Sequence, residues 1–120
     1  MDFEIKQRNA NDVVILDISG NLDSRSAPLL KVRLESLISF GHNKIVLNLS
    51  DVDFIDSTGV GSLIYGQKIV NPVVGGIHII GLSQQNLNIF SVLNLTEVFS
   101  IMATEDVAVG SFHQDGSTIH

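Results

Sequence analysis

Apolar residues at every second position mark the strands that the chain is expected to form. Phe3 and Ile5 alternate with charged neighbours over residues 3–8, and the stronger run VVILDIS covers residues 13–19. The NAND segment between them, residues 9–12, has the composition of a turn, so we expect an antiparallel hairpin. Continuous apolar runs predict buried strands: KIVLNLS at 44–50, IHIIGL at 77–82 and the shorter VFSI at 98–101.

Four segments between or after these strands have helical spacing, and each starts at a hydroxyl residue that can cap a helix. The expected caps are Ser24 or Ser26, Ser57 or Thr58, Ser83, and Thr104. The first helix should end at Gly41. The second spans residues 57–70 and stops before Pro72, and the third spans about residues 84–93. The inward-facing residues are expected to be Leu30, Leu34, Leu37 and Ile38 in the first helix and Leu87, Phe90 and Leu93 in the third.

The resulting order, β-β-α-β-α-β-α-β-α, predicts an α/β fold. Strands that alternate with helices indicate parallel crossover units, so the sheet should be mostly parallel with an N-terminal antiparallel hairpin. A chain of 120 residues has the length of a single domain. We expect residues 1–113 to form that domain and residues 114–120 to be a disordered tail.

Composition narrows the function classes. The chain has 44% hydrophobic residues and no cysteine, which excludes disulfides, zinc-thiolate sites and thiol nucleophiles. Its net charge of -6 argues against nucleic-acid binding, which depends on lysine and arginine. The N-terminal residues do not resemble a signal peptide, and no apolar run reaches the roughly 20 residues of a membrane span. We expect a soluble, cytoplasmic protein without membrane insertion.

Carboxylates follow the third strand at Asp51, Asp53 and Asp56, where open α/β sheets place functional groups. A phosphoreceiver or phosphotransferase that used them with Mg²⁺ would also need an acidic pair after an earlier strand and a later lysine. The chain offers only Asp23 there and no lysine beyond Lys68. The four histidines share no metal-ligand spacing, and GVG lacks the rest of a dinucleotide loop. We therefore expect no metal, no cofactor and no enzymatic activity.

The segment FIDSTGVGSLIYG, residues 54–66, joins the third strand to the second helix and carries more than a helix cap requires. One hydroxyl would suffice as a cap, and each glycine inside a helix costs up to about 1 kcal/mol relative to alanine. On a helical wheel, Val60, Leu63, Ile64, Gln67 and Val70 face the sheet, whereas Gly59, Gly66 and Ser62 form a flank of small residues. Tyr65 and Ile69 fall opposite the core, which indicates a docking surface.

This segment resembles the central motif of the STAS domain, and the likeness extends over ISGNLDSRSAPLL, KIVLNLSDVDFIDSTGVGSLI, GGIHIIGLSQQNLNIFSVLNLTEVFSI and TEDVAVGSF. The chain is most similar to the stand-alone anti-sigma-factor antagonists of bacteria. The resemblance implies a partner switch in which the unphosphorylated antagonist binds an anti-sigma factor that is also a serine kinase of the GHKL type. Phosphorylation releases the antagonist, and a PP2C-type phosphatase resets it.

The same resemblance implies that Ser57 is the phosphorylated serine, with Thr58 as the reserve. We expect the partner to contact a surface made by Asp23, Asp56, Ser57, Thr58, Gly59, Gly61, Ser62, Tyr65 and Ile69. An alternative keeps the fold without phosphorylation, as an accessory or scaffold subunit of a lipid-transport or other regulatory complex. Tyr65 and Ile69 would equally support self-association, so the oligomeric state stays open.

Overall fold

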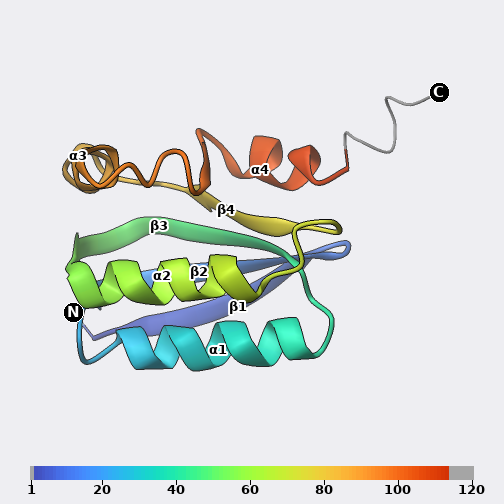
Figure 1. Ribbon diagram of the computed structural model, residues 1–120, viewed down its shortest axis with the longest axis horizontal. Coiled ribbons are helices and arrows are strands. Elements are labelled where there is room, and N and C mark those ends of the chain that lie inside the picture. The colour runs from blue at the N-terminus through green and yellow to red at the C-terminus, as the bar shows by residue number, and fades with distance from the viewer. Residues whose placement is uncertain (1, 114–120) are drawn as a thin grey trace.

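The computed structural model describes residues 2–113 and has the expected order of elements. Strands and helices alternate along the chain after the N-terminal hairpin (Figure 1). The strands are β1 (Glu4–Ala10), β2 (Val13–Leu22), β3 (Lys44–Ile55), β4 (Gly76–Ile80) and β5 (Ser100–Met102). The helices are α1 (Ala27–Ser39), α2 (Ser57–Ile69), α3 (Gln84–Val92) and α4 (Glu105–Ser111). The α/β prediction is therefore confirmed.

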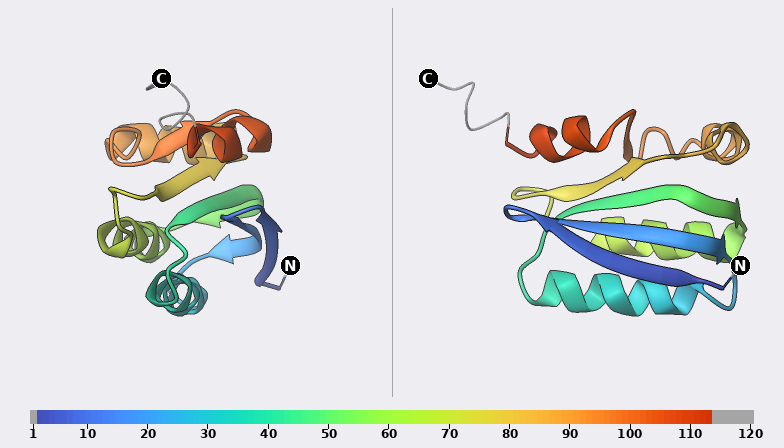
Figure 2. Two further views of the ribbon diagram at one scale, coloured as in Figure 1. Left: turned by 90° about the vertical axis from the view of Figure 1, so that its right-hand side faces the viewer. Right: turned by 180° about the vertical axis from the view of Figure 1, so that it is seen from behind.

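The strands form one sheet in the order β1-β2-β3-β4-β5. β1 and β2 are antiparallel and joined by the two residues between Ala10 and Val13, and the remaining neighbours are parallel. Both halves of the topology prediction are confirmed. Figure 2 shows β1 along one border of the sheet, α1 and α2 side by side on one face of it, and α3 and α4 beyond β4.

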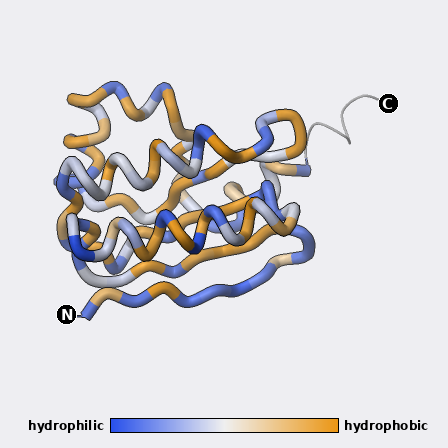
Figure 3. Tube along the Cα trace, turned by 60° about the horizontal axis from the view of Figure 1, so that its bottom comes forward, coloured by the Kyte–Doolittle hydropathy of each residue, from blue (hydrophilic) through white to orange (hydrophobic). Residues whose placement is uncertain are grey.

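The main core lies between the sheet, α1 and α2, and it is almost entirely aliphatic. Leu16, Leu47 and Ile79 from three adjacent strands are fully buried in it, as are Leu34 of α1 and Leu63 of α2. Figure 3 shows the contrast along the tube between the hydrophobic inner strands and the largely hydrophilic β1 and hairpin turn. Because the two faces of a strand alternate, the residues between these positions reach the other side of the sheet.

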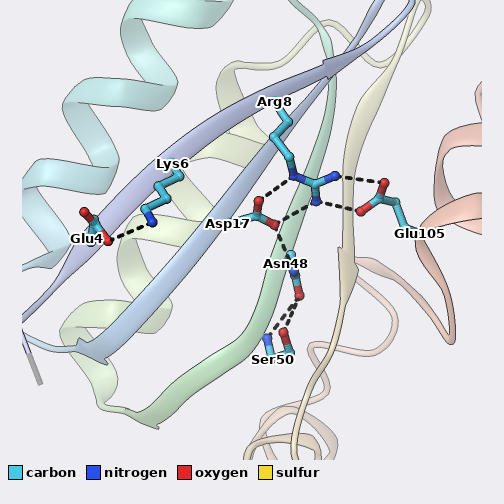
Figure 4. A network of polar contacts seen from close by, with 7 residues as sticks. All are labelled: Glu4, Lys6, Arg8, Asp17, Asn48, Ser50 and Glu105. Atoms are coloured by element: carbon cyan, nitrogen blue, oxygen red, sulfur yellow. Dashed lines mark hydrogen bonds and ion pairs between the residues drawn. The ribbon is translucent and has the colours of Figure 1, made fainter.

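That second face carries polar residues beside a small apolar cluster, which includes Ile15, Val46 and Ala108 of α4. Arg8 donates to both carboxylate oxygens of Asp17, with its Nη2 2.9 Å from one of them, and to Glu105 at 2.7 and 3.1 Å. The Arg8 hydrogen bonds lower the pKa of Asp17. Asn48 donates to Asp17 at 2.8 Å (Figure 4). The network connects β1, β2 and β3 to the first turn of α4.

Local signals in the sequence identified most helix ends. Ser83 and Thr104 accept from the backbone N–H groups of Asn86 and Val107, as expected of N-caps. Gly41 has φ of +91° and its N–H reaches Ile38 while that of His42 reaches Leu37, the bonding of a Schellman motif. The C-terminal end of α1 is therefore confirmed.

One predicted buried position and one predicted strand end are wrong. Leu93 is 51% exposed because α3 ends at Val92, one residue earlier. Asn86 lies in the core instead, where its side chain donates to the backbone oxygen of Val52 at 3.2 Å. β3 also continues beyond Ser50 to Ile55, so Asp51 and Asp53 belong to the strand and not to a loop after it.

Candidate functional site

The end of β2 and the start of α2 meet at one edge of the sheet. Leu22 pairs with Ile55 in the register between β2 and β3, and the N–H of Asp56 donates to the Leu22 oxygen at 3.1 Å. The loop that carries Asp23 therefore begins next to the first residue of α2, Ser57. Parallel strands end at a common edge, which is why segments 34 positions apart in the sequence (23 and 57) lie together here.

The cap of α2 is Asp56, so the prediction that Ser57 or Thr58 caps the helix is wrong. The Asp56 carboxylate accepts the Gly59 N–H at 2.9 Å, and the Asp56 backbone is extended. Ser57 and Thr58 are the first two residues of the helix itself, and both are exposed. Within residues 2–113 neither hydroxyl makes a hydrogen bond. The site therefore presents two free hydroxyls beside an occupied cap.

The Asp23 loop is held in place by its own hydrogen bonds. Ser26 donates to the Asn21 oxygen at 2.6 Å and accepts the Asp23 N–H at 2.9 Å. It occupies the N-cap position of α1 but makes no capping hydrogen bond through its side chain, which corrects its expected role. The Asp23 carboxylate accepts the N–H groups of Arg25 and Ser26, and these bonds lower the pKa of Asp23. The carboxylate is thus ionised and fixed at the edge of the site.

The flank of small residues on α2 packs against other parts of the chain, so it is not the exposed surface that the helical wheel indicated. Gly59 lies against Leu22, whose oxygen would be 2.2 Å from a Cβ at that position. A Cβ at Gly66 would lie 2.7 Å from the side chain of Leu34 in α1. Ser62 is 5% exposed and donates to the Gly59 oxygen. Gly59 and Ser62 are buried by the chain itself, whereas Gly61 is exposed. The partner surface that includes these three residues stays a prediction.

Tyr65 and Ile69 were expected to stand free of the core, but both are half-buried against α1. The Tyr65 hydroxyl donates to Glu35 at 2.6 Å, which raises the pKa of Tyr65, and the Lys31 ammonium lies 4.3 Å from the centre of its ring. The two residues line a shallow groove with Val32 and other residues of α1. They connect α2 to α1, at about two helical turns from Ser57 for Tyr65 and about three turns for Ile69.

An exposed aromatic residue three positions before Ser57 completes the surface and was missed in the sequence. Phe54 is 45% exposed. The register between β2 and β3 shifts between Gly20 and Asn21, so Val52 and Ile55 both point inward although they are three residues apart. Strict alternation cannot hold across such a bulge, and Phe54 is turned outward. The three-residue spacing of Val52 and Ile55 in the sequence could have indicated the bulge and the exposure of Phe54.

The site consists of exposed polar groups and one aromatic ring on a largely preformed edge. Among the described residues, no three histidine, aspartate or glutamate side chains are grouped so that they could hold a metal ion. None of the helices in residues 2–113 has the length and hydropathy to cross a membrane. The arrangement offers free hydroxyls, carboxylates and a helix N-terminus, which suit recognition by another protein.

Comparison with known proteins gives a consistent assignment. The family model of the STAS domain matches residues 4–108. An anti-sigma-B factor antagonist of Bacillus subtilis is 30% identical over 109 residues, which are 91% of this chain and 97% of the relative. An anti-sigma F factor antagonist of Paenibacillus polymyxa is 25% identical over 112 residues, 92% of this chain and 93% of the relative.

Solved structures show the same fold. An anti-sigma factor antagonist from Mycobacterium paratuberculosis superimposes with a TM-score of 0.85 at 19% identity, covering 93% of this chain and 95% of the other. The Bacillus cell fate determinant SpoIIAA in its phosphorylated form gives 0.69 at 22% identity, covering 92% and 98%. With the family model matching most of its length, the chain belongs to the STAS domain family.

Proposed function

We propose that this protein is an anti-sigma-factor antagonist that is switched by phosphorylation of Ser57. Two relatives that match this chain over nearly its whole length are named antagonists of anti-sigma factors. In this proposal the unphosphorylated protein binds an anti-sigma factor, which is also a serine kinase of the GHKL type. A PP2C-type phosphatase removes the phosphate. The protein itself acts by binding and not by catalysis.

The observation that carries the proposal is the free hydroxyl of Ser57. Asp56 takes over the cap of α2, so the fold does not use the Ser57 side chain. The residue is exposed at the first position of a helix, where a kinase can approach it from solvent. Thr58 shares the exposure and is the reserve acceptor.

A phosphate at this position would leave the fold intact. It would lie beside the first backbone N–H groups of α2, which have no partner inside the helix, and at the positive end of the helix dipole. It would add about -1.5 to -2 charges at neutral pH. Its main effect would therefore fall on a partner that must remove water from this surface.

The proposed contact surface is the set of residues that stand free around Ser57. Asp23 and Asp56 bring carboxylates from two loops, and Phe54 offers an apolar anchor at its edge. Thr58 and Gly61 continue the exposed side of the first turn of α2. Tyr65 and Ile69, at the far end of the helix, extend the surface where the groove against α1 begins.

Phosphate mapping with the candidate kinase tests this assignment. The purified protein, Ser57→Ala and Thr58→Ala are incubated with ATP and a GHKL-type anti-sigma factor from the same genome, and intact mass is followed. We expect one phosphate on the wild type and on Thr58→Ala, and none on Ser57→Ala. Full phosphorylation of Ser57→Ala would instead assign the site to Thr58 or elsewhere.

The accessory-subunit alternative predicts a different result from the same material. Under it, no anti-sigma factor would modify the wild-type protein, and tagged protein would copurify with transport components. A kinase reaction that goes to one phosphate per chain, together with recovery of the anti-sigma factor from lysate, would exclude it. The test therefore separates the two functions without relying on the fold that they share.

A further inference from the structure

β1 is an edge strand whose outer side has no strand beside it in the part of the chain that the structure describes. It pairs with β2 along its full length, from Glu4 to Ala10, and begins the strand order of the sheet. Figure 2 shows it running along the border of the sheet in the view from behind. Such an edge presents a row of unpaired backbone N–H and C=O groups, a template for a further strand.

The hairpin determines which residues of β1 present those groups outward. Ala10 and Val13 flank a two-residue turn and form a hydrogen-bonded pair, and hydrogen-bonded and non-hydrogen-bonded pairs then alternate along the ladder. When the pairs are counted back from Ala10, the non-hydrogen-bonded pairs with β2 include those of Ile5 and Gln7. Their backbone groups therefore point away from β2, toward a strand that would add to this edge.

Charge order selects one register for a second copy of the same strand. A twofold axis at Ile5 places Glu4 of each copy opposite Lys6 of the other. An axis at Lys6 would oppose the two lysines, and an axis at Gln7 would oppose Lys6 to Arg8. Opposite charges across strands stabilise a pair and like charges destabilise it. Only the axis at Ile5 places unlike charges opposite each other without also placing like charges opposite each other.

A groove beside this edge gives the contact a hydrophobic component. Phe3 and Ile5 line it together with Leu29 and Val32 of α1, around about 450 Å³, and the polar residues Glu4, Arg33 and Ser36 complete the lining. Leu29 is 58% exposed and Val32 is 63% exposed. With the axis at Ile5, the grooves of the two copies adjoin on the same side of the joined sheet. The exposed leucine and valine of both copies would then cover the central pair of isoleucines.

We propose that the protein forms a symmetric homodimer through β1, with Ile5 paired to Ile5 and Glu4 to Lys6 across the axis. The occupant of the edge is a second copy because the charge order of β1 is complementary to itself in this register. Charged side chains on an edge strand also discourage pairing with unrelated strands, which makes the contact selective. The surface differs from the one around Ser57, so the inference does not rest on the proposed function.

Sedimentation equilibrium over a range of protein concentrations tests the dimer and its register. The wild type should move from the mass of one chain toward that of two as concentration rises. Glu4→Lys and Lys6→Glu, measured separately, should each weaken dimerisation by about tenfold or more, since each opposes like charges at both symmetric pairs. An equimolar mixture of these two variants should dimerise again, and so should the double variant Glu4→Lys/Lys6→Glu.

Lys68→Glu is the matched control, because it makes the same change of charge on an exposed residue of α2, far from β1. It should dimerise like the wild type, and circular dichroism should show all variants folded. A wild type that keeps the mass of one chain at every concentration would overturn the proposal. Dimerisation unaffected by Lys6→Glu, or not restored in the mixture and in the double variant, would also overturn it.

Discussion

At the start of α2, Asp56 caps the helix and the neighbouring Ser57 keeps its hydroxyl free of hydrogen bonds within the described residues. Asp56 accepts the Gly59 N–H and so stabilises the helix, whereas the Ser57 hydroxyl is left free. A serine that both capped the helix and accepted a phosphate would lose its cap when modified. The division allows the surface to change its charge without a change in the fold.

This division predicts unequal costs for two adjacent alanine substitutions. Asp56→Ala leaves the Gly59 N–H without its acceptor and should lower the free energy of unfolding by about 1 kcal/mol. Ser57→Ala removes no hydrogen bond and should change it by less than about 0.5 kcal/mol. Urea denaturation followed by circular dichroism measures both. A larger loss for Ser57→Ala than for Asp56→Ala would return the capping role to the serine.

His78 on β4 predicts a dependence of stability on pH. Its ring is half-buried, stacks on Phe112 with centroids 3.8 Å apart, and has Nδ1 3.1 Å from the Ala108 oxygen. Burial lowers the pKa of His78 below its ordinary 6.5, although the Ala108 contact opposes this. The unfolded chain therefore takes up a proton first, and stability should fall as the pH drops below 6.5 until the folded-state pKa is passed.

Thermal melts at several pH values between 7.5 and 5 measure this effect in the wild type and in His78→Gln. The difference in stability between the two proteins should narrow on acidification, because only the wild type has to protonate this ring. His42→Gln, at an exposed position in the loop before β3, serves as the control and should follow the wild type. A constant difference between wild type and His78→Gln across the range would contradict the account.

At the scale of elements, the glycines of α2 have different reasons to be there. Gly59 allows the helix to start against the backbone of Leu22, while a Cβ at Gly61 would meet nothing within 4 Å. The sequence shows two glycines in one turn and cannot distinguish them, because the distinction depends on where β2 ends. This is why a helical wheel grouped Gly59 with an open flank that the fold closes.

Alanine substitutions at Gly59 and Gly61 should change the free energy of unfolding in opposite directions. Gly59→Ala forces a carbon toward the Leu22 oxygen and should destabilise the protein by about 2 kcal/mol or more, despite the better helix propensity of alanine. Gly61→Ala should stabilise it by about 0.5 to 1 kcal/mol. Differential scanning calorimetry of both variants measures the shifts. Equal effects at the two positions would mean that α2 does not approach Leu22 as closely as described.

At the scale of the whole molecule, periodicity and turn chemistry were enough to predict the order of elements and the mostly parallel sheet. Long apolar runs such as VVILDIS and KIVLNLS have only one stable placement, inside a sheet covered by helices. A candidate site could be proposed from the sequence because most of its residues, from Asp56 to Ile69, are close together in the chain, whereas Asp23 comes from a separate segment. Its details could not, since the burial of Ser62, the outward turn of Phe54 and the cap at Asp56 are set by contacts between separate segments.

The surface around Ser57 and the exposed edge of β1 lie in different parts of the molecule. The surface around Ser57 lies at the edge where β2 and β3 end, and the edge of β1 lies along the border of the sheet. Asp2 and Phe3, just before β1, share a groove with Asp23 and Arg25 of the site. A dimer through β1 would therefore border the Asp23 loop, which belongs to the proposed contact surface.

The affinity for the anti-sigma factor, measured by titration calorimetry on unphosphorylated and phosphorylated protein, tests the central claim most directly. The account predicts that phosphorylation of Ser57, or Ser57→Asp, weakens binding by at least about tenfold. Ser57→Ala should bind like the unphosphorylated wild type, and the melting temperature of Ser57→Asp should stay within about 2 °C of it. Equal affinity of the phosphorylated and unphosphorylated forms, or a Ser57→Asp protein that loses binding because it unfolds, would contradict the account.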